Sequence, residues 1–159
     1  ADWPRPWMAL GIGSSEPWKQ WGAARFAELA LALPRPPAGS IFIVGGPGER
    51  GLGDEILRLI SEGGGAAADA IALPLEQTAA LLAHCRGYIG NDTGVLNIAA
   101  ALGTPALGLF GGSPLLTHSR FIHALVPPDG RGGMAAITVA QALDAFAQLD
   151  GFDETRRTV

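Results

Sequence analysis

Short apolar segments alternate with amphipathic segments along this 159-residue chain, and this alternation restricts the fold more than any other feature. The apolar segments lack the polar alternation of a half-exposed strand, which is typical of parallel strands buried on both faces. We expect strands at residues 7–13, 40–46, 70–73, 88–91, 105–111 and 123–127. We expect helices at residues 22–33, 52–62, 76–85 and 95–102, and a last helix that begins at Thr138. The sequence therefore predicts an α/β fold with a doubly wound, Rossmann-like and mostly parallel sheet of about six strands.

Length and composition predict a single domain. A chain of 159 residues with 48% hydrophobic residues is large enough for one core and hardly large enough for two. We assign residues 1–6 to a linker, residues 7–150 to the domain and residues 151–159 to a frayed tail. Because the chain begins at Ala1 with a Pro-rich segment, we expect it to be a piece of a longer protein.

Charge, the length of the apolar runs and cysteine content restrict the partners and the setting of the chain. The chain has 11 basic and 15 acidic residues, a net charge of -4 and no basic cluster, so a nucleic-acid partner is not expected. No apolar run reaches the roughly 18 residues that indicate a transmembrane segment. The single cysteine cannot form an internal disulfide. Together these features favour a reduced, cytoplasmic setting.

Residues 91–94 have the pattern of an anion-binding turn. They follow an apolar strand and precede an alanine-rich helix at 95–102 that contains neither Pro nor Gly. Asp92 and Thr93 are both good N-cap residues, and Gly94 leaves room for a ligand at the first helical turn. The amides of that turn and the helix dipole favour a phosphate. The alternative, in which Asp92 or Thr93 only caps the helix, stays open.

Glycine-bearing loops should meet at one edge of the predicted sheet, since the carboxyl ends of parallel strands lie together. These are the loops at Gly13, Gly46, Asn91 and Gly111. Next to the first of them, Ser14 can donate a hydrogen bond to an anion. Lys19 follows in the same loop and would neutralise a phosphate, although a solvated surface lysine is the alternative.

Residues 46–51 match the G-x-G-x-x-G pattern of a dinucleotide site and stand between a strand and a helix. Two features count against that interpretation. Pro47 removes one of the amides that would contact a pyrophosphate. The acidic residue expected about 20 positions on should close the next strand, whereas Asp69 precedes the strand predicted at 70–73. An NAD-dependent oxidoreductase is therefore kept as an alternative function.

The sequence contains no pattern typical of a metal site or of a nucleophilic enzyme. Its three histidines lack metal-ligand spacing and have no accompanying carboxylate cluster. There is no G-x-S-x-G motif. Cys85 lies near the end of an apolar helix face and is interpreted as a buried, inert thiol. We expect neither a metal nor a cofactor.

The order of these motifs resembles glycosyltransferase family 9, which comprises the ADP-heptose:lipopolysaccharide heptosyltransferases and their relatives. The resemblance runs from about Trp7 to Leu149. Its segments are residues 13–15, 19–21, 25–30, 43–49, 90–94, 99–105 and 109–111, of which the Asn-Asp-Thr-Gly turn with its alanine-rich helix is the most specific. That family has the two-domain GT-B fold. The present chain resembles its C-terminal, nucleotide-sugar-binding half.

The resemblance implies roles for particular residues. The turn matching Asp92, Thr93 and Gly94 holds the donor diphosphate, and the lysine matching Lys19 contacts the donor phosphates. Asn97 would also belong to the phosphate site, together with Ser14. Gly46 and Glu49 would bind the nucleotide, with Glu49 near the ribose.

The resemblance also implies a reaction and partners. The family transfers sugar with inversion and without a metal, and its acidic catalytic base sits in an N-terminal acceptor-binding domain. No catalytic residue can therefore be assigned in this chain. The expected partners are a nucleotide-sugar donor, that N-terminal domain, and a glycolipid or saccharide acceptor. The expected location is the cytoplasm, including the inner face of the bacterial inner membrane.

Two positions depart from the family pattern. The family usually has histidine where this chain has Asn97, which forms hydrogen bonds but carries no charge, so a weaker phosphate contact is expected. Residues 111–115 read Gly-Gly-Ser-Pro-Leu where the family usually has Gly-Pro-Thr-Asp-Pro, which leaves the identity of the sugar open. A nucleotide-binding module without catalysis is the other alternative function.

Overall fold

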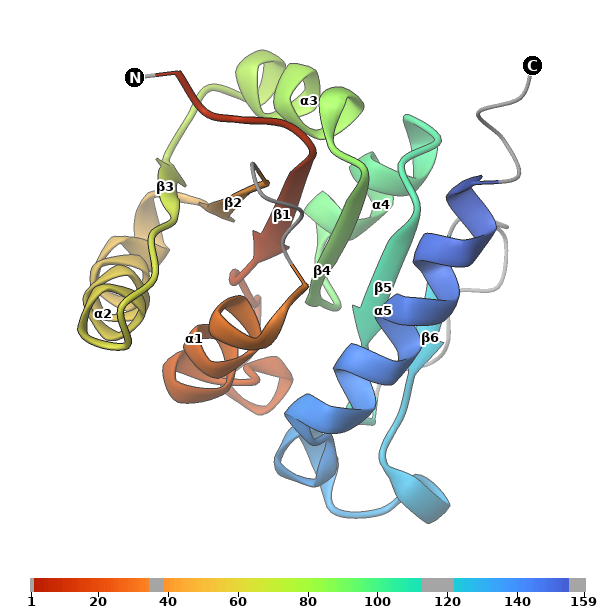
Figure 1. Ribbon diagram of the computed structural model, residues 1–159. Coiled ribbons are helices and arrows are strands. Elements are labelled where there is room, and N and C mark those ends of the chain that lie inside the picture. The colour runs from red at the N-terminus through yellow and green to blue at the C-terminus, as the bar shows by residue number, and fades with distance from the viewer. Residues whose placement is uncertain (1, 35–38, 113–121, 155–159) are drawn as a thin grey trace.

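The computed structural model describes residues 2–34, 39–112 and 122–154, with only the backbone described at 150–154. Its sheet has six parallel strands in the order β3-β2-β1-β4-β5-β6 (Figure 1). The strands are β1 (Trp7–Gly11), β2 (Ser40–Gly45), β3 (Ala68–Ile71), β4 (Gly87–Asn91), β5 (Ala106–Leu109) and β6 (Ile122–Leu125). This arrangement confirms the predicted doubly wound α/β class.

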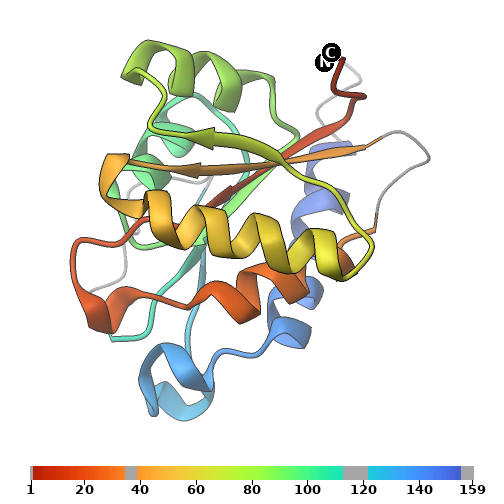
Figure 2. The same ribbon diagram turned by 90° about the vertical axis from the view of Figure 1, so that its left-hand side faces the viewer.

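Helices cover both faces of the sheet. They are α1 (Ala23–Ala32), α2 (Arg50–Glu62), α3 (Leu75–His84), α4 (Gly94–Ala101) and α5 (Val139–Glu154). Helices α1, α2 and α5 lie on one face, and α3 and α4 lie on the other (Figures 1 and 2). Within the parts of the chain that the structure describes, no helix has the length and hydrophobicity to span a membrane.

The buried strands explain why the sheet needs both helical layers. On β1, Leu10 packs into the cluster that includes the residues of α1, α2 and α5, whereas its neighbour Ala9 packs into the cluster on the α3 and α4 side. Ile89 and Tyr88 divide between the same two clusters on β4. Because successive side chains of a strand point to opposite faces, every position must be apolar, and this removes the polar alternation from the sequence.

The strand order reverses between β1 and β4, which pair in parallel at the middle of the sheet. The helix that follows β1 lies on one face and the helix that follows β4 lies on the other (Figure 1). In open α/β sheets a reversal of this kind opens a crevice at the carboxyl ends of the two strands, where ligands bind. A ligand site is therefore expected between the loops after β1 and β4.

The third strand differs from its predicted position. It spans Ala68–Ile71 instead of 70–73, because the positive φ of 60° at Ala72 ends it early. Asp69 thus lies inside β3 rather than before a strand, with its side chain exposed. A polar side chain is tolerated there because β3 is at the edge of the sheet.

Parts of the predicted linker and tail have defined structure within the described residues. Ser40 Oγ donates a hydrogen bond to the carbonyl oxygen of Pro4 (2.7 Å), and the Ser40 amide donates one to that of Pro6 (3.0 Å). The ring of Trp3 packs edge-on against Phe42, with 5.9 Å between the ring centroids. At the other end, α5 continues to Glu154, so residues 151–154 are helical rather than frayed. The remaining tail, 155–159, lies outside the described residues.

Candidate functional site

Asn91, the last residue of β4, joins the two loops at the crevice. Its side chain is fully buried, and Nδ2 donates to the carbonyl oxygens of Ile12 (3.2 Å) and Gly13 (3.1 Å) and to Gln20 Oε1 (3.2 Å). Three oxygen atoms around one amide nitrogen fix the orientation of the side chain. Asn91 therefore holds the end of β4 against the loop after β1.

Gln20 completes this connection and received no individual role from the sequence. Its Nε2 donates to the carbonyl oxygen of Ile12 (2.8 Å) and to Ser14 Oγ (3.3 Å), while its Oε1 accepts from Asn91 and from the Gly22 amide. The predicted phosphate residue Ser14 is thereby held at the pocket wall. The sequence signals for Gln20 were its place in segment 19–21 of the family pattern and its position between Lys19 and Trp21.

Lys19 and Asp92, both predicted site residues, form an ion pair across the crevice. The distance from Lys19 Nζ to Asp92 Oδ2 is 3.4 Å, and the side chains are 21% and 15% exposed. Lys19 is thus neither a solvated surface lysine nor far from the turn. The carboxylate of Asp92, which by itself would repel an anion, instead holds an ammonium group at the start of α4.

The N-terminus of α4 has no side-chain cap. Thr93 is the N-cap residue and its backbone is extended, yet its side chain makes no capping hydrogen bond. Thr93 is therefore the N-cap residue by position, but its side chain does not satisfy the amides of the first turn. The first-turn amides need a partner from outside the helix. A Cβ added at Gly94 would meet nothing within 4 Å, so the approach to these amides is open.

Asn97, the residue in place of the family histidine, faces the same end of α4. Its exposed Nδ2 donates to the Thr93 carbonyl oxygen over 3.4 Å, one turn back along the helix. This is a weak contact, and a small rotation of the side chain would release it.

A pocket of about 270 Å³ lies beside this helix start. Its lining brings together four of the predicted residues, Ser14, Gly46, Glu49 and Thr93. The ion pair of Lys19 with Asp92, the open face of Gly94 and the side chain of Asn97 belong to the neighbouring α4 end rather than to the lining. The predicted residues thus lie in two neighbouring groups, one lining the pocket and one at the start of α4.

Glu49 lines the same pocket from the turn after β2, whereas the α4 start follows β4. Its Oε2 accepts a hydrogen bond from the Gly46 amide (2.7 Å) in the turn after β2. A Cβ built on Gly13 would lie 3.5 Å from Glu49 Oε1, so the carboxylate faces the loop after β1. A carboxylate accepts hydrogen bonds and repels phosphate, which makes this wall suited to hydroxyl groups.

Of the four loops expected at one rim, the loop at Gly111 is covered. A Cβ on Gly111 would lie 2.7 Å from the Met134 amide nitrogen, because the short helical turn Gly133–Ala136 packs over it. The loops at Gly13, Gly46 and Asn91 remain at the crevice. Residues 113–115, which depart from the family pattern, lie outside the described residues.

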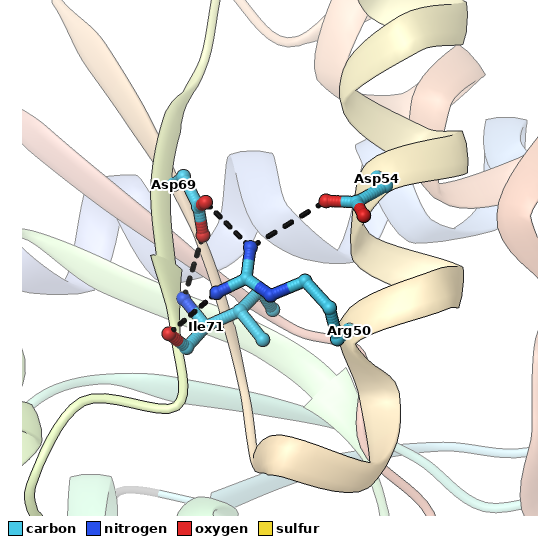
Figure 3. Close-up of polar contacts among 4 residues, drawn as sticks. All are labelled: Arg50, Asp54, Asp69 and Ile71. Carbon is cyan, nitrogen blue, oxygen red and sulfur yellow. Dashed lines mark hydrogen bonds and ion pairs between the residues drawn. The ribbon is translucent and has the colours of Figure 1, made fainter.

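The G-x-G-x-x-G segment follows β2 rather than β1, one strand away from the reversal of strand order. Arg50, within that segment, is held by β3 (Figure 3). Arg50 Nη1 lies 2.6 Å from Asp69 Oδ2, and Nη2 donates to the Ile71 carbonyl oxygen (3.0 Å). Asp54 lies 3.5 Å from the same Nη1. The segment therefore attaches α2 to the edge of the sheet.

Asp69 takes part in this attachment instead of reading a ribose. Burial opposes its ionisation, but hydrogen bonds from the Ile71 amide and from Arg50 hold the pKa of Asp69 below its ordinary value. The distance from Asp69 Oδ1 to the Ile71 amide nitrogen is 2.9 Å. Because the carboxylate is already bonded, the acidic residue that a dinucleotide site requires is not available here.

The sequence and the fold both match known proteins. Residues 1–120 match the family model of glycosyltransferase family 9 (heptosyltransferase). Lipopolysaccharide heptosyltransferase 2 of Salmonella typhimurium is 31% identical over 117 residues, which are 69% of this chain and 33% of that protein. Lipopolysaccharide heptosyltransferase 2 of Escherichia coli K12 is 30% identical over 130 residues, which are 77% of this chain and 37% of that protein.

A solved structure of E. coli ADP-heptose LPS heptosyltransferase II superimposes with a TM-score of 0.79 at 26% identity, over 95% of this chain and 48% of that one. The chain thus spans about a third of the curated relatives and about half of the solved one. The family match extends over strands β1 to β5 and therefore includes the α4 turn, Lys19 and Glu49. The chain belongs to glycosyltransferase family 9, the heptosyltransferase family.

Proposed function

We propose that this chain is the donor-binding half of an inverting, metal-independent glycosyltransferase of lipopolysaccharide or related glycan synthesis. The donor is a nucleotide sugar of the ADP-heptose type. The observation that carries the proposal is the uncapped start of α4, which opens beside Lys19 at the reversal of strand order. The description of the E. coli relative as an ADP-heptose enzyme supports the choice of donor.

In this proposal the diphosphate lies at the start of α4. The first-turn amides, the Thr93 hydroxyl and the Lys19 ammonium then contact its oxygen atoms. Asp92 keeps Lys19 at the site when no ligand is bound. The ribose hydroxyls donate to Glu49, which lines the pocket from the turn after β2. Because the carboxylate of Glu49 lies apart from Lys19 and the α4 amides, the ribose and the diphosphate of the nucleotide each have one preferred place.

The same groups would assist transfer. Negative charge grows on the nucleotide diphosphate as the bond to the sugar breaks, and fixed amides with a nearby ammonium stabilise that charge without rearranging. The catalytic base and the glycolipid or saccharide acceptor belong to an N-terminal acceptor-binding domain. Transfer in the cytoplasm, at the inner face of the inner membrane, is part of the same proposal.

Calorimetry with ADP, UDP, GDP and NAD tests the donor site, and we expect ADP to bind most tightly. Binding of NAD without any binding of ADP or an ADP-sugar would overturn the proposal in favour of an oxidoreductase.

A transfer assay with the matching N-terminal half tests the enzyme. If an ADP-sugar binds but no N-terminal half restores transfer, the chain is a nucleotide-binding module without catalysis. The replacement of the family histidine by Asn97 is the feature that favours this second candidate.

A further inference from the structure

Tyr88, the only tyrosine of the chain, has a buried hydroxyl that the donor site described above does not use. It lies on β4, and its ring extends over the register pair Gly11 and Gly90 on the neighbouring strands β1 and β4. A Cβ on Gly11 would overlap the Tyr88 hydroxyl, and a Cβ on Gly90 would lie 2.5 Å from it. The absence of side chains at these two glycines therefore leaves space for the phenol at the carboxyl end of the sheet.

The Tyr88 hydroxyl has no hydrogen-bond partner among the described residues. Tyr88 is fully buried and yet borders the pocket, together with Thr93. Burial raises the pKa of Tyr88, and the neighbouring Thr93 hydroxyl acts in the opposite direction. The phenol therefore remains a neutral donor at physiological pH. Buried polar groups without partners are rare and call for an explanation.

We propose that Tyr88 is a positioning residue for Thr93 in the diphosphate site, an inference that rests on the proposed function. When phosphate binds, the Tyr88 hydroxyl donates to Thr93 Oγ1, and the Thr93 hydroxyl donates its own hydrogen to a phosphate oxygen. Thr93 is partly exposed whereas Tyr88 is fully buried, so the ligand meets Thr93 and not the phenol. A chain of hydrogen bonds strengthens each of its members.

The substitution Tyr88→Phe tests this role because it keeps the ring over Gly11 and Gly90 and removes only the hydroxyl. We expect ADP to bind about three- to tenfold more weakly, the range of one neutral hydrogen bond. The melting temperature without ligand should stay equal or rise, since no hydrogen bond is lost there. Adenosine, which has no phosphate, should bind both proteins equally.

A double-mutant cycle separates positioning from direct contact. In a Thr93→Val background Tyr88→Phe should cause no further loss of ADP affinity, whereas in the matched control Thr93→Ser, which keeps a hydroxyl, its effect should persist. Additive losses in the Thr93→Val background would overturn the proposal, as would equal ADP affinity of Tyr88→Phe and the wild type. If ADP does not bind the wild type at all, the proposed function itself fails.

The single tyrosine also allows a direct spectroscopic test. In protein carrying ¹³C-labelled tyrosine, one ring signal belongs to Tyr88. Its ζ-carbon resonance should shift and saturate with ADP but not with adenosine, and the shift should diminish in Thr93→Val. An ADP-saturated protein with an unmoved Tyr88 signal would contradict the new hydrogen bond.

Discussion

The ammonium of Lys19 lies 3.4 Å from the carboxylate of Asp92, and this pair connects the loop after β1 to the loop after β4. The indole of Trp18 lies below the same ammonium, with 5.3 Å from Nζ to the ring centroid. These contacts place a positive charge at the start of α4 before any ligand arrives. A positioned charge loses less conformational entropy on binding than a mobile lysine would.

Lys19→Ala should weaken ADP binding by about 1.5–3 kcal/mol, because it removes a charge-assisted contact with the phosphates. Titration calorimetry measures this change. Arg58→Ala is a matched control, because it removes an exposed positive charge on α2 that pairs with Glu62 away from the site. Asp92→Ala should also weaken ADP binding, since Lys19 is then no longer held. Unchanged affinity in both site variants would remove the proposed phosphate site.

Asn91→Ala should lower the free energy of unfolding by about 1–3 kcal/mol, since the Gly13 carbonyl oxygen loses its side-chain donor and the Ile12 carbonyl oxygen keeps only Gln20 Nε2. Urea unfolding followed by circular dichroism gives this value. Asn97→Ala serves as the control, because the side chain of Asn97 is exposed and its loss should change stability by no more than about 0.5 kcal/mol. Equal stability of both variants would show that Asn91 does not connect the loops.

Asn97→His should make ADP affinity depend more strongly on pH than in the wild type. An imidazole at this position would gain a proton below about pH 6.5 and then attract the phosphate. Affinity of the variant should therefore rise relative to the wild type as the pH falls from about 8 to about 5.5. Calorimetry across this range measures the ratio of the ADP affinities of the variant and the wild type. Because both proteins bind the same ADP, protonation of ADP itself cancels in this ratio. A constant ratio would place the side chain of residue 97 away from the phosphates.

Asp69→Asn should destabilise the protein at neutral pH and have less effect in acid. The folded-state pKa of Asp69 is held below its ordinary value of 3.8, so its contribution is present above that value and is lost as the pH falls through the folded-state pKa. Both Asp69 and Arg50 are 44% exposed, so solvent screening keeps the effect at pH 7 small. Thermal unfolding of both proteins from neutral to acidic pH measures it. A difference that grows in acid would contradict the ion pair.

The strands and helices could be predicted because their signals are local. Apolar runs and helical periodicity located five of the six strands and the five α-helices to within about two residues, and the sheet order then placed Gly13, Gly46 and Asn91 at one crevice. The prediction placed the third strand two residues too late, because the apolar pattern gives no weight to the positive φ of Ala72, which ends the strand, or to the hydrogen bonds of Asp69 within it. Neither the backbone angle of Ala72 nor the hydrogen bonds of Asp69 can be seen in a pattern of apolar residues.

The sequence alone determined the fold class, the strand-turn-helix pattern at residues 91–94 and the residues that belong to the family pattern, because these depend on neighbours along the chain. Tertiary structure alone decided which polar groups meet: Asn91 bonds Gln20 across 71 positions, Asp92 holds Lys19, and the hydroxyl of Tyr88 lies over Gly11. Such contacts follow from strand order and register. Side chains far apart in the sequence come within hydrogen-bond distance only when β1 and β4 pair in parallel at the centre of the sheet.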